Sequence, residues 1–142
     1  MMNEKDAILI MKSWKLFVGI EATVAGDLFY ARLFQQNPQL KSVFNSSLEK
    51  KSELLYIFLN AIISLLHNLK DCETDIQALA REYAEIGVTP VHYEEIRQAL
   101  LWTVKTGLNK DWNEELEQAW SRTSIIVMQI MKSANFDNLS IK

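Results

Sequence analysis

The sequence contains few of the residues that interrupt regular structure or cross-link a chain. Only four glycines and two prolines occur in 142 residues, so long loops and many-turned β architectures are not expected. Cys72 is the single cysteine, which excludes a disulfide within the chain and supplies no metal-binding spacing. We therefore expect a protein of a reducing, cytoplasmic setting.

Excess positive charge is also absent. Lysine and arginine number 15 against 18 aspartates and glutamates, a net charge of −3, and no cluster of basic residues stands out. This balance gives no electrostatic basis for binding nucleic acid or an anionic membrane surface. The first residues are charged and lack the apolar core of a signal peptide. Residues 54–66 form the most apolar stretch, which at about 13 residues is too short to span a bilayer.

Hydrophobic residues recur at helical spacing through most of the chain. They make up 49% of the residues, and this length suits one domain, residues 1–142, with one core. Helix-breaking and helix-capping residues separate these stretches of helical spacing from one another. The predicted helices cover about residues 3–18, 21–36, 50–69, 74–86, 90–107 and 111 onward, with a short helical segment from 38 to 44. We therefore predict an all-α fold of six longer helices and one short helix around a single core.

The first helix shows its apolar residues three to four positions apart. Ile8, Met11, Trp14 and Val18 share one face. We predict that this face packs on the core.

Three stretches in fixed order carry a family resemblance. They are residues 28–34 (LFYARLF) followed by Asn37-Pro38 and Phe44, then residues 87–93 (GVTPVHY), and finally Ala119-Trp120. Their order and spacing resemble the globins, closest to single-domain bacterial globins and the globin domain of flavohaemoglobins, over about residues 12–131. The resemblance implies the globin fold, with haem as cofactor and a diatomic gas as ligand.

The resemblance assigns five residues to a haem pocket. Phe44 matches the phenylalanine that packs against haem, and Tyr30 matches the distal tyrosine that hydrogen-bonds iron-bound oxygen. Leu54 matches the distal position where many globins have histidine or glutamine. Phe58 lies one turn further along the same helix, and Tyr93 matches a tyrosine on the proximal side.

The family pattern breaks at the proximal position. Tyr83 stands where globins carry the histidine that binds haem iron. A tyrosine phenolate can ligate haem iron, as in catalase, and would favour the ferric state. The alternative is that Tyr83 only fills the proximal space, with its hydroxyl bonded to backbone or water. Two lesser departures are Arg97 in place of a usual glycine and Ser124 in place of a usual tyrosine.

Neither histidine is well placed to replace the missing imidazole. His67 is about 20 Å further along its helix than Leu54 and points to another side, so we predict a surface position. His92 lies three positions into its helix and has no ligand role in the family. We expect it near a haem propionate, although a shifted connection would bring it to the pocket. For Arg97 the choice is between reaching water and neutralising a propionate or another anion.

Two functions follow from these residues. The first is a haem protein with Tyr83 as the metal ligand, which senses or handles O2, NO or a related oxidant rather than carrying oxygen. The second is a haem-free regulatory or interaction module that binds another ligand and forms a homodimer through its last two helices. No catalytic motif or reductase domain is found, so the sequence does not favour an enzyme.

Overall fold

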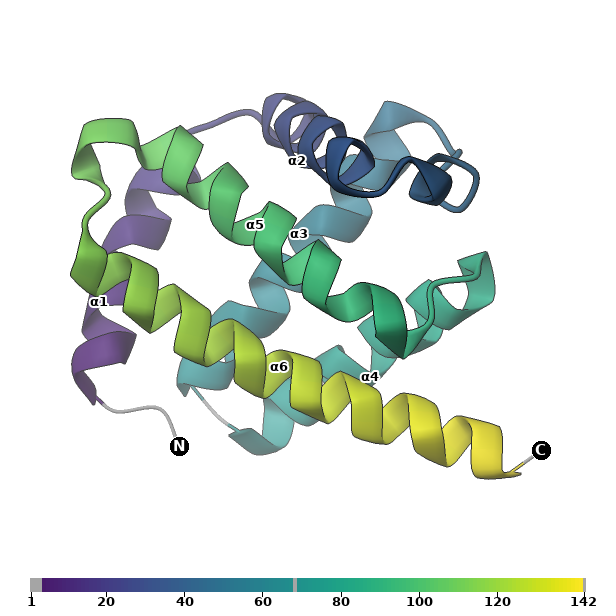
Figure 1. Ribbon diagram of the computed structural model, residues 1–142. Helices are drawn as coiled ribbons and strands as arrows, with labels where there is room; N and C mark the ends of the chain where they lie inside the picture. The colour runs from purple at the N-terminus through teal and green to yellow at the C-terminus, as the bar shows by residue number, and fades with distance from the viewer. Residues whose placement is uncertain (1–3, 68, 142) are drawn as a thin grey trace.

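The structure is a computed structural model that describes residues 4–67 and 69–141, with side chains described for 4–67 and 72–133. Six α-helices are α1 (Glu4–Phe17), α2 (Ala22–Gln36), α3 (Leu48–His67), α4 (Leu69–Ile86), α5 (Tyr93–Leu108) and α6 (Glu114–Ile141). Short 3-10 helices are η1 (Pro38–Lys41), η2 (Pro90–His92) and η3 (Asn109–Asp111). In Figure 1, α5 and α6 lie side by side in front of α3, and α2 crosses above them. The predicted all-α fold is confirmed.

Local signals explain most of the helix ends. The Asn37 side chain accepts a hydrogen bond from the Gln39 backbone N–H at 3.1 Å, and Pro38 occupies the first turn of η1, so α2 stops and η1 starts there. Gly87 ends α4 with a φ of 104°, a conformation that glycine adopts without strain. None of the described helices is long and apolar enough to cross a membrane.

Helix α4 begins at residue 69 rather than at the predicted residue 74. Cys72 is fully buried, so the face that packs on the core continues before the expected start. Asp75, expected in a helix cap, instead accepts a hydrogen bond from the Ser64 hydroxyl of α3 at 3.1 Å. Tertiary packing therefore continues the helix through the polar segment at residues 74–75, where the sequence predicts a helix start.

The predicted inner face of α1 is wrong at two of its four residues, whereas Trp14 packs on the core as predicted. Ile8 and Val18 are more than half exposed, whereas Ile10 and Phe17 are buried together with the polar Asp6 and Ser13. These two polar residues bind α6. The Asp6 carboxylate accepts two hydrogen bonds from Arg122, at 2.7 and 2.8 Å, and the Ser13 hydroxyl accepts one from the indole N–H of Trp120 at 2.9 Å. Because these buried polar residues have hydrogen-bond partners on another helix, the spacing of hydrophobic residues alone does not identify the buried face.

Gly26 allows α2 and α3 to cross closely. A Cβ atom at this position would lie 3.0 Å from the Ser52 Cβ and 3.3 Å from the Ser52 Cα. We expect Gly26→Ala to lower the free energy of unfolding by about 1–3 kcal/mol, the usual cost of overpacking. Urea unfolding followed by circular dichroism measures it. Gly19→Ala is the control, because its Cβ would meet only the Leu16 carbonyl at 3.5 Å. An equal loss in both variants would contradict the close-crossing explanation.

Candidate cofactor site

Three of the aromatic residues assigned to the pocket lie with neighbouring rings in the core, and Phe58 is buried in the same core. Tyr30 comes from α2, Phe44 from the segment after η1, Phe58 from α3 and Tyr83 from α4. The ring centroids of Tyr30 and Phe44 are 5.3 Å apart, and those of Phe44 and Tyr83 are 6.0 Å apart at 90°. Each of the four side chains is at most 3% exposed. The structure therefore brings together residues that are far apart in the sequence.

The hydroxyl of Tyr30 donates its hydrogen bond to the backbone. Its hydroxyl donates a hydrogen bond to the Lys51 carbonyl in the first turn of α3, at 2.8 Å. The Lys51 ammonium lies 5.1 Å from the centre of the Tyr30 ring and 5.4 Å from that of Phe34. Burial raises the pKa of Tyr30, so the phenol stays neutral. In this arrangement Tyr30 fastens α2 to α3 and does not offer its proton to a ligand.

Tyr83 is held at the C-terminal end of α4. Its carbonyl accepts a hydrogen bond from the Val88 N–H at 2.9 Å, which closes the turn around Gly87. Burial raises the pKa of its hydroxyl well above the usual value, and the neighbouring Tyr30, Tyr93 and Glu82 raise it further. A phenolate would therefore form here only if a positive centre were supplied. The surroundings favour a neutral phenol.

The core as folded leaves no room for haem between Tyr83 and Phe44. A flat group sandwiched between two side chains needs about 3.5 Å on each face, about 7 Å in all. A centroid separation of 6.0 Å at a right angle is instead the distance of two aromatic rings in direct contact. The aliphatic residues around the cluster are also almost inaccessible: Leu79, Val88, Ile96 and Leu100 are 0–2% exposed. In this conformation, a haem placed between Tyr83 and Phe44 would require their two rings to move apart.

A surface cleft of about 310 Å³ lies between α3 and α4, with the half-buried Leu54 in its wall. Its charged lining residues are Lys50, Glu53, Glu82 and Glu85. Three carboxylates against one ammonium make this mouth unfavourable to an anionic ligand.

Both histidines lie outside the aromatic cluster. His92 is part of η2, and its Nδ1 accepts a hydrogen bond from the Thr89 N–H at 3.1 Å. It therefore caps a turn, a role the sequence reasoning missed although the Thr-x-x-His spacing at a helix start was visible. His67 is exposed at the end of α3. Among the residues searched, no group of three or more histidine, cysteine or acidic side chains could hold a metal ion.

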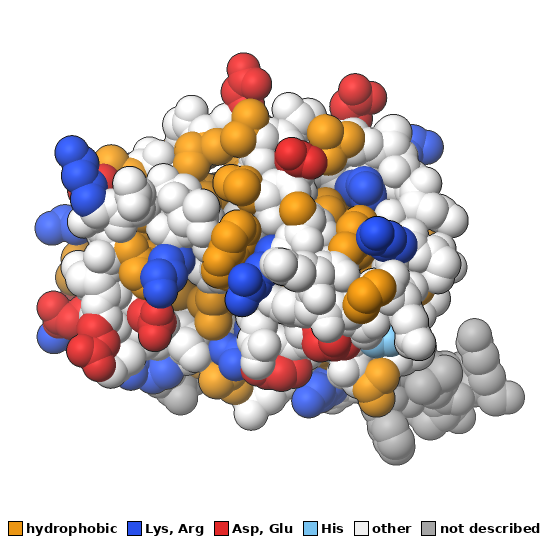
Figure 2. Space-filling model, turned by 45° about the horizontal axis from the view of Figure 1, so that its top comes forward, with side chains coloured by type: hydrophobic (Ala, Val, Ile, Leu, Met, Phe, Trp, Pro, Cys, Tyr) orange, Lys and Arg blue, Asp and Glu red, His pale blue; other side chains and the backbone are white. Residues whose placement is uncertain are grey.

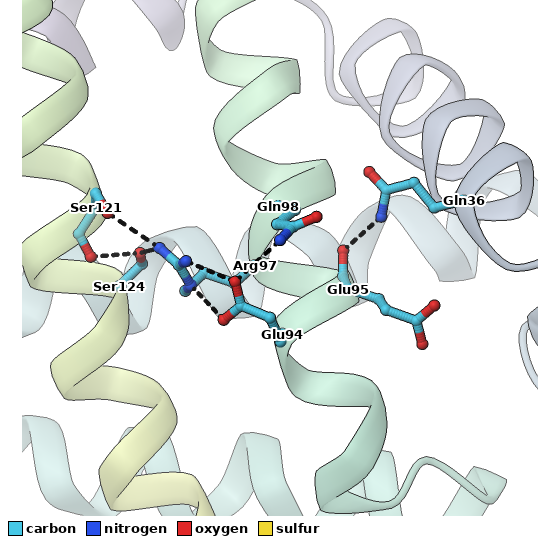
Figure 3. Close-up of polar contacts among 7 residues, drawn as sticks. All are labelled: Gln36, Glu94, Glu95, Arg97, Gln98, Ser121 and Ser124. Atoms are coloured by element: carbon cyan, nitrogen blue, oxygen red, sulfur yellow. Dashed lines mark hydrogen bonds and ion pairs between the residues drawn. The ribbon is translucent and has the colours of Figure 1, made fainter.

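Arg97 takes neither of the two positions expected for it. Figure 3 shows its guanidinium in the seam between α5 and α6, bound to Glu94 through two hydrogen bonds of 2.7 and 2.9 Å. It also reaches the hydroxyls of Ser121 at 3.1 Å and Ser124 at 3.5 Å, and its side chain is only 12% exposed. The hydrogen bond from Arg97 lowers the pKa of Glu94. The two lesser departures from the family pattern, Arg97 and Ser124, are therefore in contact.

Tyr93 begins α5 as a fully buried residue, close enough to act electrostatically on Tyr83. It thus joins the same core as the other aromatic residues assigned to the pocket. Of the eight residues assigned to the pocket, the described structure places His92 and Arg97 elsewhere and Leu54 at the surface cleft.

Comparison with known proteins places this geometry in a family. Flavohemoprotein B of Dictyostelium discoideum is 26% identical over 140 residues, which cover 96% of this chain and 32% of that protein. The neuroglobin of Chaenocephalus aceratus is 26% identical, over 92% of this chain and 90% of its own length. Thus the chain spans about a third of the flavohaemoprotein and most of the neuroglobin.

Solved structures and a family profile agree with these relatives. A hexacoordinated haem protein from an anhydrobiotic tardigrade superposes with a TM-score of 0.84 at 17% identity, covering 94% of this chain and 95% of that one. The engineered carbene transferase RmaNOD from Rhodothermus marinus gives 0.82 at 20% identity, over 99% and 98%. The globin profile matches residues 27–131. The chain therefore belongs to the globin family, and that membership makes haem its expected cofactor.

Proposed function

We propose that this globin works with its core filled by its own side chains, as a haem-free module that binds ligands or partners at its surface. The observation that supports this proposal is the direct contact of the Phe44 and Tyr83 rings, with centroids 6.0 Å apart and both residues at most 3% exposed. Tyr83 then serves as a packing residue. The prediction of a homodimer through α5 and α6 belongs to the same proposal, and the mass of the protein in solution decides it.

A second function is favoured by the position of Tyr83. The family resemblance assigns Tyr83 to the proximal position, haem is the expected cofactor of that family, and Tyr83 lies beside Phe44 and near Tyr30. In this second candidate the protein is a haem globin with Tyr83 on the iron, which senses or handles a diatomic gas or an oxidant. Such a function requires the core to open, because the rings of Tyr83 and Phe44 must first separate.

A titration with ferric haem distinguishes the two functions. We expect purified protein to show no stoichiometric Soret band, and its near-ultraviolet circular dichroism and melting temperature to stay unchanged, because side chains fill the site. A stoichiometric Soret band that disappears in Tyr83→Phe would overturn the proposal and establish the second candidate.

Two further variants test whether haem binding is prevented by the missing imidazole ligand or by the lack of space in the core. Tyr83→His supplies the usual imidazole but leaves Phe44 and Phe58 in place, so we expect it to bind no haem stoichiometrically. A full Soret band in Tyr83→His would mean that only the donor was missing, against the filled-core explanation. His92→Ala is the matched control, because His92 caps η2 and lies outside the aromatic cluster.

A further inference from the structure

A second surface cleft lies between α2, η1 and α5. Its volume is about 500 Å³, within the range of small-molecule sites. The lining residues are Ala31, Arg32, Phe34, Gln35, Lys41 and Trp102. Figure 2 views the molecule from the side of α2 and shows basic side chains next to hydrophobic ones on this face. The cleft thus combines positive charge with aromatic walls.

Arg32 is held in place by an aromatic ring. Its guanidinium carbon lies 5.2 Å from the centre of the Trp102 ring, and its Nε donates a hydrogen bond to the Gln36 side chain at 3.4 Å. The two terminal nitrogens of the guanidinium form the planar fork that matches a carboxylate or a phosphate. Because the side chain is already oriented, less conformational entropy is lost when an anion binds.

The positive charge of the cleft is not neutralised by the protein. The ion pairs found among the described side chains join Lys5 to Glu115, Arg97 to Glu94 and Arg122 to Asp6, and none includes Arg32 or Lys41. No acidic residue lines the cleft, although the whole chain carries a net charge of −3. The mouth between α3 and α4, in contrast, is lined by three glutamates. Positive potential is therefore concentrated at this second cleft.

We infer that this cleft binds a small organic anion with a flat apolar body. Its carboxylate or phosphate lies between Arg32 and Lys41, and its body packs on those parts of Trp102 and Phe34 that the guanidinium of Arg32 and the ammonium of Lys51 leave uncovered. The ligand chemistry follows from the lining: two cations without acidic partners bind the charge, and the aromatic walls bind the remainder. This inference names a ligand class for surface binding, and it holds whether or not the core accepts haem.

Isothermal titration calorimetry with matched probes tests the site. Indole-3-acetate and its neutral analogue indole-3-acetamide differ only in the charged group, while phenyl phosphate and inorganic phosphate test the phosphate and the need for an apolar body. We expect at least one of the two organic anions to bind at least tenfold more tightly than both indole-3-acetamide and inorganic phosphate, with an affinity that falls as salt is raised. Equal affinity for the acid and the amide, with no tighter binding of phenyl phosphate, would overturn the inference.

Substitutions in the cleft test whether the organic anion binds at Arg32 and Lys41. Arg32→Gln is expected to weaken binding at least tenfold and Lys41→Gln several-fold, whereas Lys110→Gln, an equal change of charge on η3, leaves it unchanged. Arg32→Lys keeps the charge but loses the fork, so we expect an intermediate loss. Circular dichroism establishes that each variant is folded, and Lys41 is exposed, so its replacement does not disturb the core. Unchanged affinity in both Arg32→Gln and Lys41→Gln would place binding elsewhere. Neither variant should alter the haem titration, so the two proposals fail separately.

Discussion

Replacement of Tyr83 by alanine is expected to lower the free energy of unfolding by about 3–5 kcal/mol, the usual cost of removing a large buried aromatic side chain. The Tyr83 side chain is 1% exposed and contacts the ring of Phe44 edge to face. Its loss leaves a cavity in the middle of the helix arrangement, which packed neighbours fill only in part. Urea unfolding, followed by circular dichroism in protein to which no haem was added, measures the change.

Tyr83→Phe is the matched control for that loss. It keeps the ring in contact with Phe44 and removes only the hydroxyl. We therefore expect a change of at most about 1.5 kcal/mol, the usual net contribution of one hydrogen bond of a neutral hydroxyl. A loss as large as that of the alanine variant would contradict a packing role, because stability would then depend on a bond of the hydroxyl. A Tyr83→Ala variant as stable as the wild type would contradict the filled core itself.

Helical periodicity predicted the fold well because apolar spacing and capping residues are local signals. The end of α2 at Asn37 and the end of α4 before Gly87 follow from the residues at those positions. The inner face of α1 could not be predicted in the same way. Asp6 and Ser13 are buried because Arg122 and Trp120, more than a hundred residues away, bind them. The spacing of hydrophobic residues is a local property of the sequence, so it cannot identify partners that are distant along the chain.

Prediction of the candidate site from the sequence is limited in a different way. Family resemblance assigned Tyr30, Phe44 and Tyr83 to one pocket, and their rings do lie near one another in the structure. It could not determine whether a gap remains between the rings. An aromatic residue that lines a cofactor and one that fills a core have the same spacing in the sequence. Only the separation of Phe44 and Tyr83 distinguishes them, and that separation depends on how the segment after η1 packs against α4.

The contact between Arg97 and Ser124 suggests that these two departures from the globin pattern compensate each other. By the family resemblance, Arg97 stands where glycine is usual and Ser124 where tyrosine is usual, so that a large side chain on α5 would replace one on α6. The small Ser124, which is fully buried, leaves space that the nearly buried guanidinium occupies. The two positions lie 27 residues apart, and nothing in the sequence alone pairs them.

A double-mutant cycle tests this compensation. Arg97→Gly removes the hydrogen bonds to Glu94 and Ser121 and places glycine inside α5, so we expect a loss of about 2–4 kcal/mol in the free energy of unfolding. Ser124→Tyr inserts a ring where the guanidinium lies, at a cost of about 1–3 kcal/mol. Urea unfolding of both single variants and of the double variant gives the coupling between the two positions.

The double variant should lose less than the sum of the two single losses, by about 1–3 kcal/mol, because the new tyrosine fills the space that Arg97 vacates. Arg97→Ala paired with Ser124→Tyr is the control that removes the helix-propensity effect of glycine. Strictly additive losses in both pairs would mean that the two side chains touch without depending on each other. A positive coupling would instead assign Arg97 to packing between α5 and α6.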